Sequence, residues 1–301
     1  MPKFRVLALI SATSGAFVDG VISGYSGKGQ AETSSLLQLL DRIKKGSVIV
    51  LDRFFTSLSL QAILQDYGIN YVIRGREKFV RKHLGRKNDK VITLKKKMPR
   101  PDCIYLGLDH HQYITLRLIK SSLKRKGFRT INLFILTSLL DEKREIIEQI
   151  YLKRWNVELD IRNIKTTMNS EQLRSKTPEG AEKEFWVRIL AYNLTRFIMV
   201  QSSKFTNTGP RKRSFKTALN CCIELMKNNN KLFLESALKL LSTECLKSKY
   251  RREARAIKRR NYRYPFLTAD RKKSLEQDWG YKRRRPNKKP SIDYGALNAM
   301  A

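Results

Sequence analysis

Two acidic residues stand where the chemistry of phosphoryl transfer could be built. Asp52 ends SVIVLD (47–52), an apolar run with the length of a strand buried on both faces. Catalytic groups collect at the carboxyl ends of strands in open α/β sheets. Glu158 lies within YLKRWNVELDIRNIK (151–165), a segment with helical periodicity. Carboxylates on a strand end and on a packed helix can together hold the Mg²⁺ ions that clamp the attacking and leaving oxygens of a phosphoryl group.

The helical segment sorts its side chains into two stripes when it is drawn at about 100° per residue. One stripe surrounds the acid with cations and a phenol, and it consists of Tyr151, Arg154, Glu158, Arg162 and Lys165. The neighbouring stripe is apolar and would dock the helix on a sheet; it consists of Ile150, Val157, Ile161, Ile164 and Met168. Weak salt bridges on a solvated face would explain the Arg154–Glu158–Arg162 series. They would not explain why so basic a chain gathers cations around one acid beside the docking face.

Asp52 has a simpler interpretation, since it could cap the segment that follows it or pair with Arg53. If Asp52 is instead a ligand, Asp52 and Glu158 form a site for Mg²⁺ or Mn²⁺ that is one carboxylate short. The cations beside Glu158 would then hold DNA phosphates in line.

The elements that would position these residues begin with a β-hairpin. Residues 4–12 and 16–22 are apolar and β-branched, and a short polar turn separates them. Gly46 closes the first helix, as a glycine does after a helix C-terminus. In order, the patterns predict a helix, a strand, a helix and a strand over 31–44, 47–52, 57–68 and 69–75.

On these patterns we divide the chain into five parts. The first part of an α/β core (1–75) is followed by a basic, β-rich insertion (76–140). The helix of Glu158 and the rest of the core occupy 141–205, and a basic helical region occupies 206–248. Nearly continuous positive charge with interleaved tyrosines then predicts a flexible basic tail over 249–301.

The charge of the chain indicates a polyanionic partner. It has 62 Lys and Arg against 27 Asp and Glu, a formal net charge of +35. No apolar run approaches the roughly 18 residues of a membrane span, and no secretory signal opens the sequence. The four cysteines and three histidines lack the spacing of zinc ligands or of a disulfide framework. We therefore expect a cytoplasmic, nucleoid-associated protein that does not bind membranes.

At the helical segment the sequence resembles a known family. Tyr151-x2-Arg154-x3-Glu158-x6-Lys165 is similar to the Y-R-E-K signature of the insertion-sequence-4 family of bacterial DDE transposases. LDRFFTS (51–57) resembles the region of that family's second Asp, and LRSKTPEGAEKEFWVRILAYNLTR (173–196) resembles the segment after its catalytic helix. The resemblance covers roughly residues 4 to 273.

The resemblance implies a ribonuclease-H-like mixed sheet with flanking helices and a β-rich insertion. It also implies a Mg²⁺-dependent enzyme that nicks DNA, forms hairpins and transfers strands at inverted repeats. Carried over by residue, Asp52 is the second metal-binding Asp and Glu158 the third carboxylate. Tyr151, Arg154 and Lys165 become contacts to phosphates and transposon ends. The partners would be double-stranded DNA, at the inverted repeats and the target, and a second copy in a full-length relative.

One departure concerns the family's first catalytic Asp, which lies in a D-G-T-like context upstream of the segment that opens this chain. Asp19, in VDGV, is the available substitute, but it follows a strand that matches a later position of the family. We therefore expect a fold that lacks its first strand, in a truncated or inactive copy.

Two alternatives stay open. The first is a catalytically dead remnant that binds DNA. The second is a basic RNA-binding protein with a globular centre. RNA binding would require stacking aromatics on a sheet, for which Tyr105 and Tyr113 are weak candidates.

Overall fold

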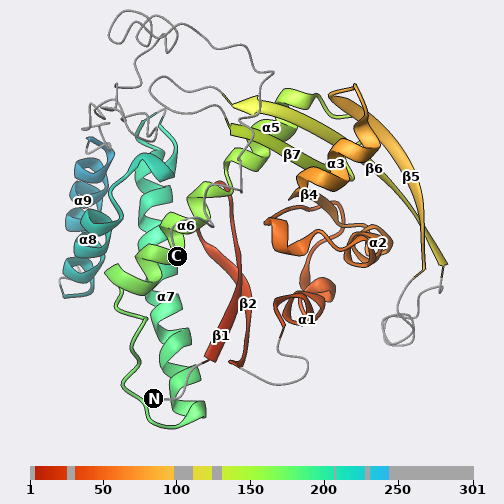
Figure 1. The fold of residues 1–301 in the computed structure, drawn as a ribbon. Coiled ribbons are helices and arrows are strands. Elements are labelled where there is room, and N and C mark those ends of the chain that lie inside the picture. Colours follow the sequence, from red (N-terminus) through yellow and green to blue (C-terminus); the bar gives the residue numbers. More distant parts are fainter. Residues whose placement is uncertain are drawn as a thin grey trace, which may run out of the picture. The chain divides into compact units, whose positions relative to one another are not determined.

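The structure, a computed structural model, describes residues 4–25, 31–97, 111–123, 131–206, 208–227 and 231–243 (Figure 1). The predicted tail over 249–301 and Tyr105 lie outside these residues. Almost all described residues belong to one compact unit, formed by 1–121 and 132–249.

The first two strands form the predicted hairpin. β1 (Phe4–Ile10) pairs with β2 (Phe17–Gly24) in an antiparallel register that places Val6 opposite Ile22. The strand alternation divides β1 between two hydrophobic cores. Leu7 and Leu9 pack against a core that the helices and sheet of residues 36–136 build. Val6, Ala8 and Ile10 pack against a second core, built mainly from the helices after residue 163.

A five-stranded mixed sheet forms the larger core, in the order β3-β4-β7-β6-β5. β3 (Val48–Leu51) and β4 (Asn70–Arg74) are parallel, and β4 pairs antiparallel with β7 (Ile131–Thr137). β6 (His111–Leu123) and β5 (Asp89–Lys97) form a long antiparallel pair at the other end. The antiparallel strands between 76 and 140 thus continue the sheet that β3 and β4 begin.

The prediction that 47–52 is buried on both faces is wrong. Val48 is 40% exposed and Ile49 alone of β3 is buried. The reason is the strand order, because β3 pairs only with β4 among the described strands. β4, in the interior of the sheet, is buried on both faces at its centre, with Tyr71, Val72 and Ile73 at 0% exposure.

Three short helices accompany these strands. The predicted helix over 31–44 is divided into α1 (Glu32–Leu37) and a 3₁₀ turn at Leu40–Arg42. Gly46 follows with a φ of 81°, the left-handed conformation expected of a glycine that turns the chain toward β3. α2 (Leu58–Asp66) confirms the second predicted helix, and α3 (Glu77–Leu84) precedes β5.

The helical segment around Glu158 is not the single helix that its periodicity predicts. α5 (Arg144–Leu152) ends in a turn at Lys153 and Arg154, and α6 (Trp155–Arg162) begins directly afterwards. A π-helical segment at Asn163–Thr167 follows α6. These irregularities change the faces on which the two predicted stripes lie.

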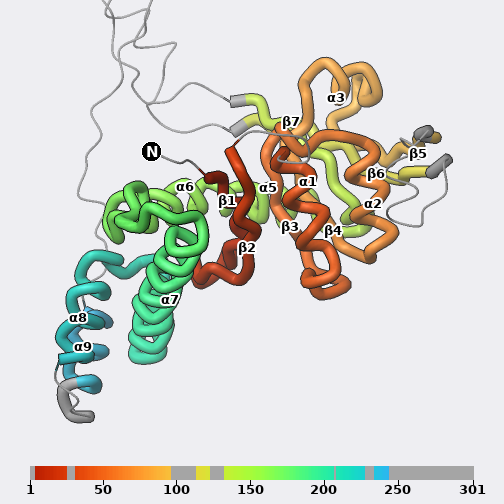
Figure 2. Tube along the Cα trace, turned by 90° about the horizontal axis from the view of Figure 1, so that it is seen from below, coloured from red at the N-terminus to blue at the C-terminus, as the bar shows by residue number. Residues whose placement is uncertain are grey.

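The remaining helices form a layer of their own. α7 (Pro178–Ser203) is the long helix, and it packs beside α8 (Phe215–Lys227) and α9 (Lys231–Thr243) (Figures 1 and 2). The sequence explains where α7 begins, because the Thr177 hydroxyl accepts a hydrogen bond from the Gly180 N–H at 3.2 Å and Pro178 opens the first turn. Among the helices that the structure describes, none is long and apolar enough to cross a membrane.

Candidate active site

Asp52 lies at the end of β3, exposed, where it begins a 3₁₀ turn at Arg53–Phe55. Its Oδ1 atom accepts a hydrogen bond from the Arg53 backbone N–H, so the capping role considered from the sequence is present. A cap of this kind occupies one carboxylate oxygen. It leaves Asp52 able to act as a ligand as well.

Arg74 is a neighbour of Asp52 that the sequence analysis missed. β3 and β4 are parallel, and Leu51 is in register with Ile73. Asp52, which follows β3, and Arg74, which ends β4, therefore lie at the same end of the two strands. Arg74, like Asp52, is a charged residue at the carboxyl end of a strand. The signal was therefore present in INYVIRG (69–75).

Tyr151 and Arg154 lie at the turn between α5 and α6. Tyr151 is buried, at 2% exposure. The Arg154 guanidinium lies 6.0 Å from the Tyr151 ring and 5.3 Å from the Trp155 ring. Its Nη2 atom donates to Glu158 Oε1 at 2.9 Å, a pair four residues apart whose carboxylate is half exposed. Arg154 is thus held between aromatic rings and a carboxylate instead of extending freely into solvent.

The strand end and the helix turn influence each other electrostatically. Burial raises the pKa of the Tyr151 hydroxyl; the positive charges of Arg154 and Arg74 oppose this shift, and the negative charge of Asp52 adds to it. For Arg154, burial works to lower the pKa of the guanidinium, but its interactions with Tyr151, Glu158 and Asp52 raise it overall. Asp52 and Glu158 therefore both act on the Arg154 side chain.

The residues at this place fit a divalent cation and a phosphate. Asp52 and Glu158 are exposed carboxylates, the hard oxygen donors that Mg²⁺ and Mn²⁺ prefer. Tyr151 Oη and Arg154 Nε are buried and form no hydrogen bond of normal geometry with a described residue, although the two side chains interact with each other. Such atoms are costly to leave unpaired, so they favour an additional polar ligand here. Within the same part of the chain, no three acidic, histidine or cysteine residues gather as a complete metal cluster.

Arg162 and Lys165 lie further along the same segment, and both are exposed. Arg162 ends α6, whereas Lys165 belongs to the π-helical segment. The predicted stripe is therefore not one solvent face: Tyr151 is buried, Arg154 is half-buried, and Glu158, Arg162 and Lys165 are exposed. Of the predicted apolar stripe, Ile164 is buried but Ile161 is 40% exposed.

Two other acids have places that the sequence did not indicate. Asp19 lies within β2, where its Oδ1 atom accepts from the Gly20 N–H at 2.7 Å and pairs with Arg42 at 3.0 Å. Asp160, two residues after Glu158, is completely buried and ion-paired with Arg196 and Arg211. A carboxylate between Leu159 and Ile161 was the available signal, but it belonged to neither predicted stripe.

The chain is similar to known proteins of one kind. Residues 3–194 match the family described as "Transposase DDE domain". The chain is also 32% identical over 146 residues to "Transposase InsG for insertion sequence element IS4" of Escherichia coli (strain K12). That alignment covers 46% of this chain and 31% of the relative, so the chain spans about a third of the length of the curated relative it matches.

Proposed function

The chain belongs to the family described as "Transposase DDE domain", and from this premise we propose that Asp52 and Glu158 are two metal-binding carboxylates for cutting and joining DNA at insertion-sequence ends. The observation that carries the proposal is the position of Arg154. Its guanidinium pairs with Glu158 and is acted on by the charge of Asp52, which links the end of β3 to α6.

Each residue of the site has a task in this reaction. Asp52 and Glu158 would hold Mg²⁺ or Mn²⁺, which when bound stabilises the charge that develops on the attacking and leaving oxygens. The Tyr151 hydroxyl and the Arg154 guanidinium would bind the phosphate whose P–O bond breaks. Arg74 would add positive charge at the same sheet edge. The exposed side chains of Arg162 and Lys165 would hold phosphates on either side.

We further propose that an additional strand supplies the third carboxylate. β1 and β3 each have one edge without a partner among the described strands. Leu9 of β1 and Ile49 of β3 nevertheless contribute to the same hydrophobic core. Unpaired edges beside a shared core favour insertion of a strand, because its backbone groups would satisfy both edges. Another chain would provide this strand.

The metal site can be tested on the whole chain without DNA. Fe²⁺ with ascorbate and peroxide cleaves a protein backbone near a bound ion, and the cuts are mapped by mass spectrometry. We expect cuts near residues 52 and 158 that Mn²⁺ suppresses, and we expect Asp52→Asn and Glu158→Gln to lose them. Glu179→Gln, in the first turn of α7, is the matched control and should keep the pattern. The same cuts in all three variants would refute the site.

A second candidate function is DNA binding without catalysis. The absence of a third carboxylate near Asp52 and Glu158 within the described residues favours it. Incubation of the chain with Mg²⁺ and DNA bearing its element's ends distinguishes the two. The two-carboxylate proposal expects nicking only when a peptide carrying the proposed strand and its Asp is added, and a failure of every such peptide favours the binding function.

RNA binding has less support. Tyr113, on β6, is 66% exposed and lies 5.6 Å from Lys95 Nζ, which would suit stacking on a base. Membership of a transposase family instead favours DNA as the partner.

A further inference from the structure

The helix that carries Glu158 is held in place by a carboxylate, whereas apolar packing contributes little to holding it. Asp160 is the one residue of α6 that is buried, and its exposure is 0%. Leu159 and Ile161, on either side of it, are 47% and 40% exposed. Two residues correspond to about 200° of helix rotation, so Asp160 and Glu158 leave α6 in nearly opposite directions.

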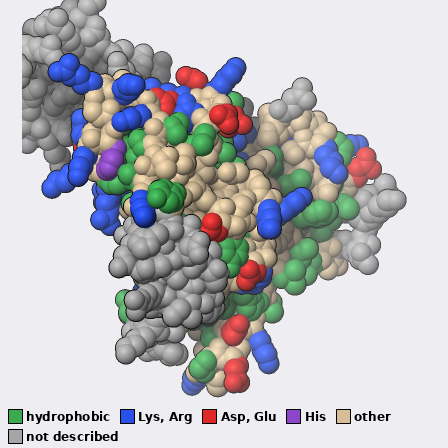
Figure 3. Space-filling model, turned by 90° about the vertical axis from the view of Figure 1, so that its right-hand side faces the viewer, with side chains coloured by type: hydrophobic (Ala, Val, Ile, Leu, Met, Phe, Trp, Pro, Cys, Tyr) green, Lys and Arg blue, Asp and Glu red, His purple; other side chains and the backbone are tan. Residues whose placement is uncertain are grey.

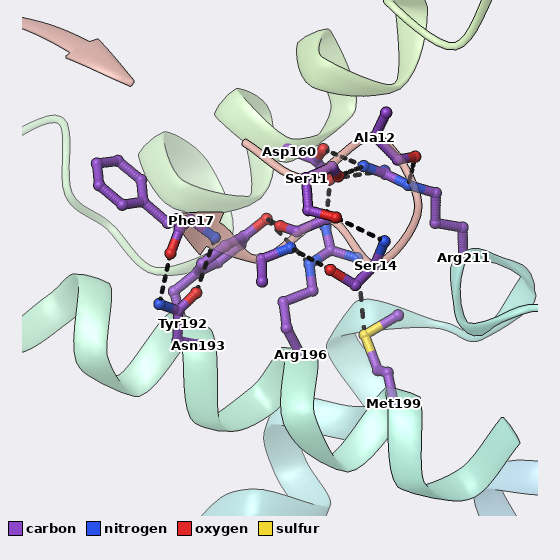
Figure 4. A network of polar contacts seen from close by, with 12 residues as sticks. Ser11, Ala12, Ser14, Phe17, Asp160, Tyr192, Asn193, Arg196, Met199 and Arg211 are labelled. Carbon is purple, nitrogen blue, oxygen red and sulfur yellow. Dashed lines mark hydrogen bonds and ion pairs between the residues drawn. The ribbon is translucent and has the colours of Figure 1, made fainter. Parts of the chain in front are cut away.

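Two arginines bind the Asp160 carboxylate from different elements. Arg211, in a 3₁₀ turn at Pro210–Lys212, donates Nη1 to Oδ1 at 3.1 Å and Nη2 to Oδ2 at 2.8 Å. Arg196, in α7, donates Nη2 to Oδ1 and is only 3% exposed. Figure 4 shows the three side chains pointing toward one another from the three elements. A carboxylate held through both oxygens has little freedom to rotate.

The arginines extend the network to the turn between β1 and β2. Arg211 donates Nε to Ala12 O at 2.9 Å and Nη2 to Ser11 O at 2.8 Å. Arg196 donates Nε to Tyr192 Oη at 2.9 Å, and that hydroxyl donates to Gly15 O at 2.6 Å. The guanidinium of Arg196 also lies 5.1 and 4.9 Å from the ring centroids of Tyr192 and Phe215, two rings that pack against each other. α6 is thereby fastened to the hairpin, to α7 and to the 3₁₀ turn.

The flanking segments join α6 through irregular hydrogen bonding. On one side the chain turns at Lys153 and Arg154, and on the other side it continues as a π-helix. Continuous α-helical hydrogen bonding would transmit an orientation through these boundaries, but both are irregular. The direction of Glu158 therefore depends on the opposite side of an eight-residue helix, where Asp160 lies.

We propose that Asp160, with Arg196 and Arg211, is a positioning residue that sets the rotation of α6 and so directs Glu158 toward the metal site. The inference rests on the proposed role of Glu158. The new element of the inference is that buried Asp160 sets the direction in which exposed Glu158 points.

The test compares Asp160→Asn with Asp89→Asn in the whole chain. Asp89 pairs with Arg117 at 2.7 Å in the β5–β6 pair, so its substitution removes a charge-paired carboxylate far along the sheet from β3. Two quantities are measured: amide hydrogen exchange of residues 155–162, and the Mn²⁺ concentration that halves Fe²⁺-directed cleavage near residue 158. Arg211→Lys is the substitute variant if Asp160→Asn does not fold. It keeps the positive charge but loses the planar guanidinium that binds both oxygens of Asp160.

In Asp160→Asn we expect α6 amides to exchange about tenfold faster while α7 keeps its protection. The required Mn²⁺ concentration should rise about tenfold or more, the usual effect of losing a residue that orients a metal ligand. Asp89→Asn should change neither quantity. Faster exchange in α6 with an unchanged Mn²⁺ dependence would show that Asp160 only stabilises the helix, and it would overturn the proposal. Unchanged exchange in α6 would overturn the proposal as well. If Glu158→Gln itself leaves the cleavage unchanged, the proposed metal site fails, and the exchange rates still report whether Asp160 holds α6.

Discussion

The Tyr192 hydroxyl is held by a charged partner as well as by its buried surroundings. Tyr192 accepts from Arg196 and donates to Gly15 O, so it joins the Asp160 network to the hairpin turn. Burial raises the pKa of Tyr192 to about 12; the charge of Arg196 opposes the shift, and that of Asp160 adds to it. Removing a proton from this hydroxyl would break the hydrogen bond that fastens the turn.

The raised pKa of Tyr192 predicts that the folded protein loses stability at high pH. An unfolded tyrosine loses its proton near about pH 10, whereas folded Tyr192 keeps its proton to about pH 12. Between these values the unfolded state binds fewer protons, so the free energy of unfolding falls as the pH rises. The stability difference between the wild type and Tyr192→Phe, measured by urea unfolding, should be full below this window and shrink across it. Tyr113→Phe, at an exposed position, is the control, and a difference that stays constant to pH 12 would contradict the prediction.

At the scale of elements, the turn between β1 and β2 is shaped around an arginine. Gly15 has a φ of 80°, and a Cβ atom there would lie 2.9 Å from Arg196 Cζ. Gly46 has nearly the same backbone conformation, with a φ of 81°, but a Cβ atom there would meet nothing within 4 Å. Alanine substitutions at the two glycines therefore distinguish two destabilising effects. Both variants strain the left-handed backbone, but only the substitution at Gly15 crowds the Arg196 side chain.

Gly15→Ala should lower the stability more than Gly46→Ala. Both variants strain a positive φ, at about 1 kcal/mol each. Gly15→Ala also displaces the buried guanidinium, which adds about 1–3 kcal/mol, as overpacking of a tight interior does. Urea unfolding of the two variants and the wild type measures the difference. Equal losses would mean that Arg196 moves aside freely and that the network holds the turn less firmly than its contacts indicate.

At the scale of the whole molecule, the positive charge is distributed unevenly. On the face drawn in Figure 3, lysine and arginine side chains stand apart, with acidic side chains among them. The segment 249–289, outside the described residues, contains 17 of the 62 basic residues and only 4 of the 27 acidic ones. It therefore carries charge out of proportion to its length.

Binding to duplex DNA should be tight at low salt and weaken steeply as salt rises, because Lys and Arg contacts release counterions. Deletion of 249–289 should reduce the slope of log K against log salt for non-specific DNA. Fluorescence anisotropy with a labelled duplex at several salt concentrations measures this slope. Lys165→Ala, in the exposed π-helical segment, is the comparison. It should reduce the magnitude of the slope by about 1, the effect of losing one phosphate contact. An unchanged slope after the deletion would place the DNA-binding surface elsewhere.

The sequence by itself determined the features that depend on local pattern. Two apolar, β-branched runs separated by a short polar turn predicted the β1–β2 hairpin, and the strand that precedes Asp52 was correctly located. The spacing of Tyr151, Arg154, Glu158 and Lys165 indicated the family that the matches later supported. These features depend only on residues close together in the sequence, so an apolar run or a motif of fixed spacing is enough to predict them.

Only the tertiary structure decided which residues are buried and where the helix breaks. Among the strands that the structure describes, β3 lies at the end of its sheet because of strand order, which its own residues do not encode. Asp160 is buried because Arg196 and Arg211, 36 and 51 residues further along the chain, come together around it. A charged residue in a helix is solvated unless distant partners remove it from water. The direction of Glu158 follows from such distant contacts, so periodicity alone could place it on a helix but could not orient that helix.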